Sequence, residues 1–119
     1  MLRTLLVALT GLLLVAPLCD TSMTVTFTYQ NQAAAAVTFS SRMGTTGAWL
    51  DSDVSVPPDS SVTTASHRVE KDYWFCCVVK DAQNVTLDSV VIAGYEWKPG
   101  SSVIWSWDGT DLTPYVVIP

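Results

Sequence analysis

Polar and apolar residues alternate along short segments of the chain from Met23 onward. In residues 23–29 apolar side chains occupy every second position, and threonines fill the positions between them. Successive side chains on a β-strand point to opposite faces, so this pattern predicts a half-buried strand. Similar short segments, separated by polar reversals, continue to the C-terminus and predict about seven or eight strands.

The segment 73–80, with the sequence YWFCCVVK, differs because both of its faces are apolar up to Lys80. Odd-numbered residues would line one face and even-numbered residues the other. A strand of this kind belongs in the middle of a packed β structure, with sheet neighbours and cover on each side. Trp74 is therefore expected in the core.

The remaining strands are expected at 33–43, 48–56, 62–69, 85–93, 101–107 and 115–118. Strict alternation in 48–56 places Trp49, Asp51 and Asp53 together on a wet face. The predicted fold is all-β, a single immunoglobulin-like antiparallel β-sandwich, because a domain of that class has about a hundred residues. The Cys…Trp…Cys spacing of true immunoglobulin domains is missing from the sequence.

The N-terminus has the features of a targeting segment. Arg3 precedes TLLVALTGLLLVAPL, an apolar run shorter than the ~20 residues that a membrane-spanning helix needs. It predicts a signal peptide over residues 1–19, cleaved somewhere between 16 and 22, ahead of a β-sandwich domain at 20–119. The mature protein is expected to be secreted without a transmembrane segment, and a lipid anchor on Cys19 is the alternative.

Composition and charge exclude some partners. Only 14% of the residues are charged, and the formal net charge is −5. Removal of Arg3 with the leader makes it about −6. Nucleic acids and anionic membranes attract basic surfaces, and the sequence has no basic run, so nucleic acid is not an expected partner.

The three cysteines allow several states. Cys76 and Cys77 are adjacent, and a disulfide between neighbours is strained, so they are expected as free thiols or with one of them bonded to Cys19 or to another chain. A catalytic cysteine needs a base, and the only histidine is His67. A small hydrolase that uses Cys76 and His67 is therefore one alternative function.

Five tryptophans in so short a chain suggest a recognition surface. Trp49 shares its predicted face with aspartates, and Trp97 lies in the loop 94–100 beside Tyr95 and Glu96. A flat ring flanked by hydrogen-bonding groups suits a sugar or a protein partner. These four residues are the predicted ligand-binding residues, although the same rings could simply cap the ends of the sandwich.

No metal and no cofactor are expected. One histidine cannot complete a zinc site, the aspartate pairs 51/53 and 108/111 offer too few ligands for calcium, and no phosphate-binding loop is present. Asn84-Val85-Thr86 is a glycosylation sequon at a predicted hairpin end, which makes Asn84 a glycosylation site in a eukaryotic host.

The sequence thus predicts a secreted, non-enzymatic binding or adhesion module that recognises an extracellular protein or a glycan. One alternative is a structural or envelope protein that self-associates through edge strands, with 62–69 as the suspected edge. The second alternative is the cysteine-dependent hydrolase.

Overall fold

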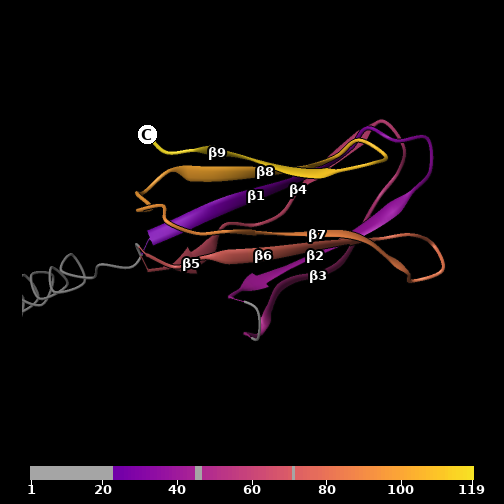
Figure 1. Ribbon diagram of the computed structural model, residues 1–119. Helices are drawn as coiled ribbons and strands as arrows, with labels where there is room; N and C mark the ends of the chain where they lie inside the picture. Colours follow the sequence, from indigo (N-terminus) through magenta and orange to yellow (C-terminus); the bar gives the residue numbers. More distant parts are fainter. Residues whose placement is uncertain (1–22, 45–46, 71) are drawn as a thin grey trace, which may run out of the picture.

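The computed structural model describes residues 23–44, 47–70 and 72–119, which form nine β-strands and no helix. Figure 1 shows two packed layers, which confirms the predicted all-β sandwich. The strands are β1 (Met23–Asn31), β2 (Val37–Met43), β3 (Trp49–Val56), β4 (Ser60–Thr63), β5 (His67–Val69), β6 (Phe75–Lys80), β7 (Thr86–Ile92), β8 (Ser101–Trp107) and β9 (Leu112–Val117). The predicted signal peptide and Cys19 lie outside the described residues, and the immunoglobulin-like topology stays a prediction.

Sheet A has the order β4-β1-β8-β9, with β5 also paired to β1, and sheet B has the order β3-β2-β6-β7. All pairs are antiparallel except β1 and β8, which run parallel. The expectation of a purely antiparallel sandwich is therefore wrong at this pair. The strands β4 and β5 are consecutive and both run antiparallel to β1, so the chain does not reverse direction between them. The later strand β8 runs parallel to β1.

Aromatic side chains from both sheets meet between the layers. Phe27 of β1 makes edge-to-face contacts with Phe75 of β6, at 5.1 Å between ring centroids, and with Trp105 of β8, at 5.5 Å. Such contacts add to the burial of apolar area, which is the main source of stability. The inward positions of β1 and β8 are the ones that alternation predicts.

The strand β6 occupies the middle of sheet B, between β2 and β7, as its sequence predicts. Phe75, Cys77 and Val79 are buried in the core. Cover was expected on both faces, but within residues 23–44, 47–70 and 72–119 a second layer covers only one face of sheet B. Trp74 precedes β6 and is 40% exposed, so it does not belong to the core, although Cys76 on the same outer side is buried.

The open edges of the sheets are interrupted. The edge strand β3 contains two register shifts, and the edge of β1 opposite β8 is divided between β4 and β5. In β9, Pro114 has no N–H to offer to another strand. Asp88 of β7 accepts the N–H of Ser89 at 2.8 Å and the N–H of Leu112 in β9 at 2.9 Å. These features oppose pairing with a further strand.

The contribution of the Asp88 hydrogen bonds to stability can be tested by substitution. Asp88→Ala removes both acceptors, so we expect the free energy of unfolding in urea to fall by about 1–2 kcal/mol, and Asp88→Asn, which retains one oxygen, to lose about half as much. Asp111→Ala makes the same change of charge at an exposed position and serves as the control. Equal stability of Asp88→Ala and the control would contradict this role.

Candidate functional site

A bulge in β3 turns Asp51 toward the interior. Phe39 pairs with Val54 and Ser41 with Asp51, so two residues of β3 face one residue of β2. Asp53, within this bulge, has a φ of 52° and donates its N–H to Ser40 Oγ at 2.9 Å. An extra residue reverses the alternation of side chains beyond it. The predicted common face of Asp51 and Asp53 is therefore wrong.

Asp51 connects the two sheets through one carboxylate oxygen. Its Oδ2 accepts a hydrogen bond from Tyr29 Oη at 2.6 Å and one from Thr64 Oγ1 at 2.9 Å, and His67 Nε2 lies 3.0 Å away. Tyr29 and His67 belong to sheet A and Asp51 to sheet B. The side chains of His67 and Asp51 are only 14% and 10% exposed. We call these four residues the Asp51 junction.

Two acidic groups near Asp51, the Tyr29 phenol and the Cys77 thiol, keep their protons. Burial, followed by the hydrogen bond to Asp51, raises the pKa of Tyr29 far above its usual range, so the phenol keeps its proton. Burial is also the main cause that raises the pKa of the Cys77 thiol, with the neighbouring Cys76 and Asp51 acting in the same direction. A thiol must ionise to attack a substrate. The junction is therefore suited to holding the sheets together.

His67 does not lie where the sequence interpretation placed it. The alternative hydrolase required His67 as a base beside Cys76. Instead the ring lies inside the sandwich, 5.2 Å from the Phe27 ring centroid, and bonds to Asp51. Cys76 alternates with the core residues Phe75 and Cys77 and so faces away from the core. Cys76 and Cys77 are both free thiols.

The junction predicts an alkaline loss of stability. An unfolded tyrosine ionises near pH 10, whereas folded Tyr29 keeps its proton above that pH. The folded state then binds more protons, so the free energy of unfolding is constant below about pH 9 and falls above about pH 10 by up to about 1.4 kcal/mol per pH unit for this group. In urea unfolding from pH 8 to 11, we expect Tyr29→Phe to start less stable and to show a shallower alkaline slope.

The control is Tyr115→Phe, since Tyr115 is exposed. Its alkaline slope should equal that of the wild type. Burial raises the pKa of Cys77 as well, so part of the slope remains in Tyr29→Phe. Parallel curves for Tyr29→Phe and the wild type would show that Tyr29 does not keep its proton in the folded state.

The four predicted ligand-binding residues do not form one patch. Trp97 is 1% exposed; its Nε1 donates to the Tyr73 carbonyl oxygen at 2.6 Å, and its ring packs on Phe75 and Tyr95. The loop folds back onto the start of β6 and buries this ring, so it cannot offer a face to a ligand. Tyr95 and Glu96 are exposed beside it, and Trp49 lies on β3.

The outer face of sheet B carries a row of neighbouring side chains that cross the four strands. Arg42 pairs with Trp49 on one side and with Cys76 on the other, and Cys76 pairs with Val91. Trp74 lies beside this row, two residues before Cys76, where its carbonyl oxygen accepts the N–H of Gly44. We call these residues the aromatic face, defined as Arg42, Trp49, Trp74, Cys76 and Val91.

Rings and charge on the aromatic face are accessible and ordered by the sheet. Trp49 is 43% exposed and Trp74 40%. The Arg42 guanidinium carbon lies 4.4 Å from the centroid of the Trp49 ring, a cation–π contact that holds both side chains. The sequence interpretation found Trp49 but missed Arg42 and assigned Trp74 to the core. The sequence did show that Trp74 and Cys76, two residues apart, lie on the same face of an extended segment, opposite Phe75 and Cys77.

The remaining predicted sites are surface turns. Asn84 has a φ of 66° and is exposed in the hairpin between β6 and β7, where its side chain is accessible. Asp108 accepts the N–H groups of Asp111 and Thr110, which lowers its pKa, so its carboxylate stabilises the turn. Among the described residues no three metal-ligating side chains come together, and no helix could span a membrane.

No protein-family model matches the chain, and no curated protein matches it significantly. Function is therefore inferred from the geometry of the molecule.

Proposed function

We propose that this chain is a secreted, non-enzymatic recognition module that binds an extracellular protein through the aromatic face. The observation that carries the proposal is the exposure of two tryptophans on the outer side of sheet B: Trp49, which stacks on Arg42, and Trp74, which lies against Gly44. Tryptophan and arginine are the residues most enriched among those that dominate the energy of protein interfaces. Val91 extends this surface with exposed apolar area.

The environment of Arg42 indicates the chemistry of the partner. Its guanidinium stacks on Trp49, and among the described residues it forms no ion pair. A partner carboxylate would form an ion pair with the Arg42 guanidinium, and apolar side chains beside that carboxylate would cover the two indole rings. We therefore expect an acidic segment with aromatic or aliphatic neighbours.

The rigidity of the aromatic face favours binding. Trp49 and Arg42 project from paired strands, and the backbone of Trp74 is held at the end of β2 by the Gly44 hydrogen bond at 2.8 Å. Side chains that are already ordered lose little conformational entropy on association. This property distinguishes the face from a flexible loop.

The two alternative functions receive less support. The interrupted edges, Pro114 and the acceptors of Asp88 oppose self-association through added strands. A hydrolase built on Cys76 would need His67 as a base, but His67 is hydrogen-bonded to Asp51 inside the sandwich, and Cys76 faces away from the core. Secretion itself rests on the N-terminal apolar run.

Selection from a displayed library of random peptides tests the proposal. We expect the wild-type protein to enrich peptides in which Asp or Glu adjoins aromatic or aliphatic residues. Trp49→Ala and Trp74→Ala should each weaken binding of a selected peptide by about tenfold or more in a titration, because each removes a large contact. Arg42→Lys retains the charge but loses the planar contact and should weaken binding of acidic peptides.

Tyr115→Ala is the matched control, since it removes an exposed ring from the opposite sheet. Thermal denaturation should show that all variants are folded. Peptides that bind the two tryptophan variants as tightly as the wild type would refute the proposed surface.

A further inference from the structure

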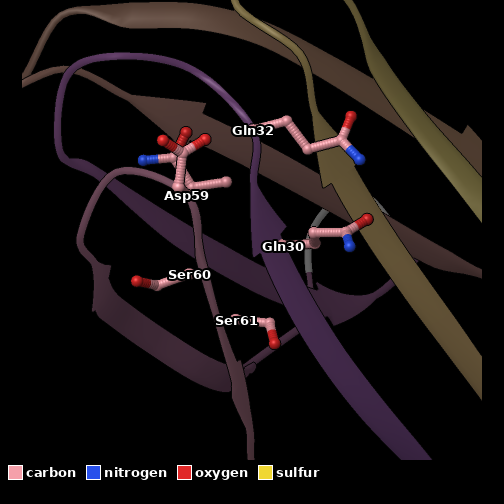
Figure 2. Close-up of a pocket in the computed structure, with 6 residues that line it drawn as sticks. Gln30, Gln32, Asp59, Ser60 and Ser61 are labelled. Carbon is pink, nitrogen blue, oxygen red and sulfur yellow. The ribbon is translucent and has the colours of Figure 1, made fainter.

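A polar hollow of about 300 Å³ lies where β1 ends and β4 begins. Figure 2 shows the side chains of Gln30 and Gln32 projecting to the same side of β1, with Asp59, Ser60 and Ser61 on the adjoining segment. Asn31 completes the lining. The sequence pattern indicates only a reversal at residues 30–32, but β1 continues through Asn31, and Gln32 N–H donates to the Trp107 carbonyl oxygen at 2.8 Å.

The floor of the hollow is fixed by buried hydrogen bonds. Asn31 is fully buried, and its Nδ2 donates to the carbonyl oxygens of Ala35 and Val56 at 2.8 and 3.1 Å. Its Oδ1 accepts the N–H of Ala33 at 2.9 Å. A buried amide with its donors and acceptor satisfied holds the backbone around it in one arrangement.

A hydrogen bond from the neighbouring strand β8 orients the Gln30 amide. The buried hydroxyl of Ser106, on β8, donates to Gln30 Oε1 at 3.0 Å. Because the oxygen of the amide is engaged in this bond, its Nε2 is left to donate to a ligand. Gln32, two residues further along, is exposed on the same side of the chain.

The rim opposite the glutamines is stiff. Pro57 and Pro58 restrict the backbone before Asp59, which has a φ of 52°. Ser60 Oγ donates to the Pro58 carbonyl oxygen at 3.1 Å, which closes this turn. The exposed carboxylate of Asp59 and the exposed hydroxyl of Ser61 are therefore held at the edge of the hollow.

The exposed ring of Tyr115 extends this surface. The register places Gln30 next to Ser106, and Ser106 next to Thr113 on β9. Tyr115 lies two residues beyond Thr113, on the same outer face of sheet A, and is 55% exposed. Because β9 is separated from β1 by β8, a glycan that starts in the hollow has to cross β8 before the C–H face of one of its pyranose units can pack on this ring.

We propose that the hollow binds a neutral saccharide, with one sugar unit in contact with the residues that line it and the rest of the glycan directed across sheet A toward Tyr115 on β9. Amide N–H groups and a carboxylate match the acceptors and donors of neighbouring sugar hydroxyls. The volume is at the lower end of ligand-pocket sizes, which fits a small sugar unit. The charged group of the hollow is the anion Asp59, so uronic acids and sulfated sugars are repelled. This site is separate from the aromatic face on sheet B.

Titration calorimetry and ¹H–¹⁵N NMR with soluble tetrasaccharides test the proposal. The probes are cellotetraose, xylotetraose, mannotetraose and chitotetraose, with tetragalacturonate as the anionic comparison. We expect saturable binding of at least one neutral probe, with amide shifts concentrated at residues 30–32 and 59–61, and no binding of the anionic probe.

Variants separate the roles of the lining residues. Gln30→Ala and Asp59→Ala should each weaken binding by about tenfold, and Ser106→Ala should weaken it less, because the Gln30 amide loses only its orientation. Gln32→Ala alters an exposed side chain and provides a second variant that should fold normally. Trp49→Ala, on the other sheet, should bind the sugar unchanged, so this test and the peptide test fail independently.

Three results would overturn the proposal. They are the absence of saturable shifts with all four neutral probes at millimolar concentration, equal binding by folded Gln30→Ala, Gln32→Ala and wild-type proteins, and tighter binding of tetragalacturonate than of every neutral probe.

Discussion

The carboxylate of Asp51 in the space between the sheets is the constraint on which the rest of the architecture depends. Apolar burial supplies most of the stability but has little directional preference, so it does not fix how one sheet lies on the other. A nearly buried carboxylate is tolerated only where donors surround it. Tyr29, Thr64 and His67 provide these donors from the opposite side.

Several irregular features of the chain serve this arrangement. The bulge at Asp53 turns Asp51 inward, and the break between β4 and β5 brings Thr64 and His67 to the same oxygen. That break also keeps β4 and β5 running in one direction along β1. Because a reversal is omitted there, β8 lies parallel to β1. The hydrogen bonds to Asp51 and the division of the strand beside β1 therefore occur at the same place in the chain.

Alternation was sufficient to predict the regular strands and failed where strands are irregular. It placed β1, β6 and β8 and the inward residues of β1 and β8 correctly. It failed at β3, because a bulge leaves no gap in the sequence, and the tolerance of aspartate for a positive φ at Asp53 was the only local hint. The prediction was wrong for Trp74, because an apolar run in the sequence does not show at which residue the strand begins. It also does not show whether a second layer covers each face of the sheet.

The surface residues were harder to predict because contacts distant in sequence decide their exposure. Trp49 was correctly predicted to be exposed, whereas Trp97 is buried, and its indole N–H donates to the Tyr73 carbonyl oxygen. The composition of the Trp97 loop does not indicate this contact. Arg42 gains its role from a neighbouring strand, and the orientation of Gln30 depends on Ser106. The residues of each outer face alternate along the strands with the residues that point into the core. Because the core separates the two faces, an aromatic and a polar surface can coexist on one small sandwich, and substitutions on one should not alter the other.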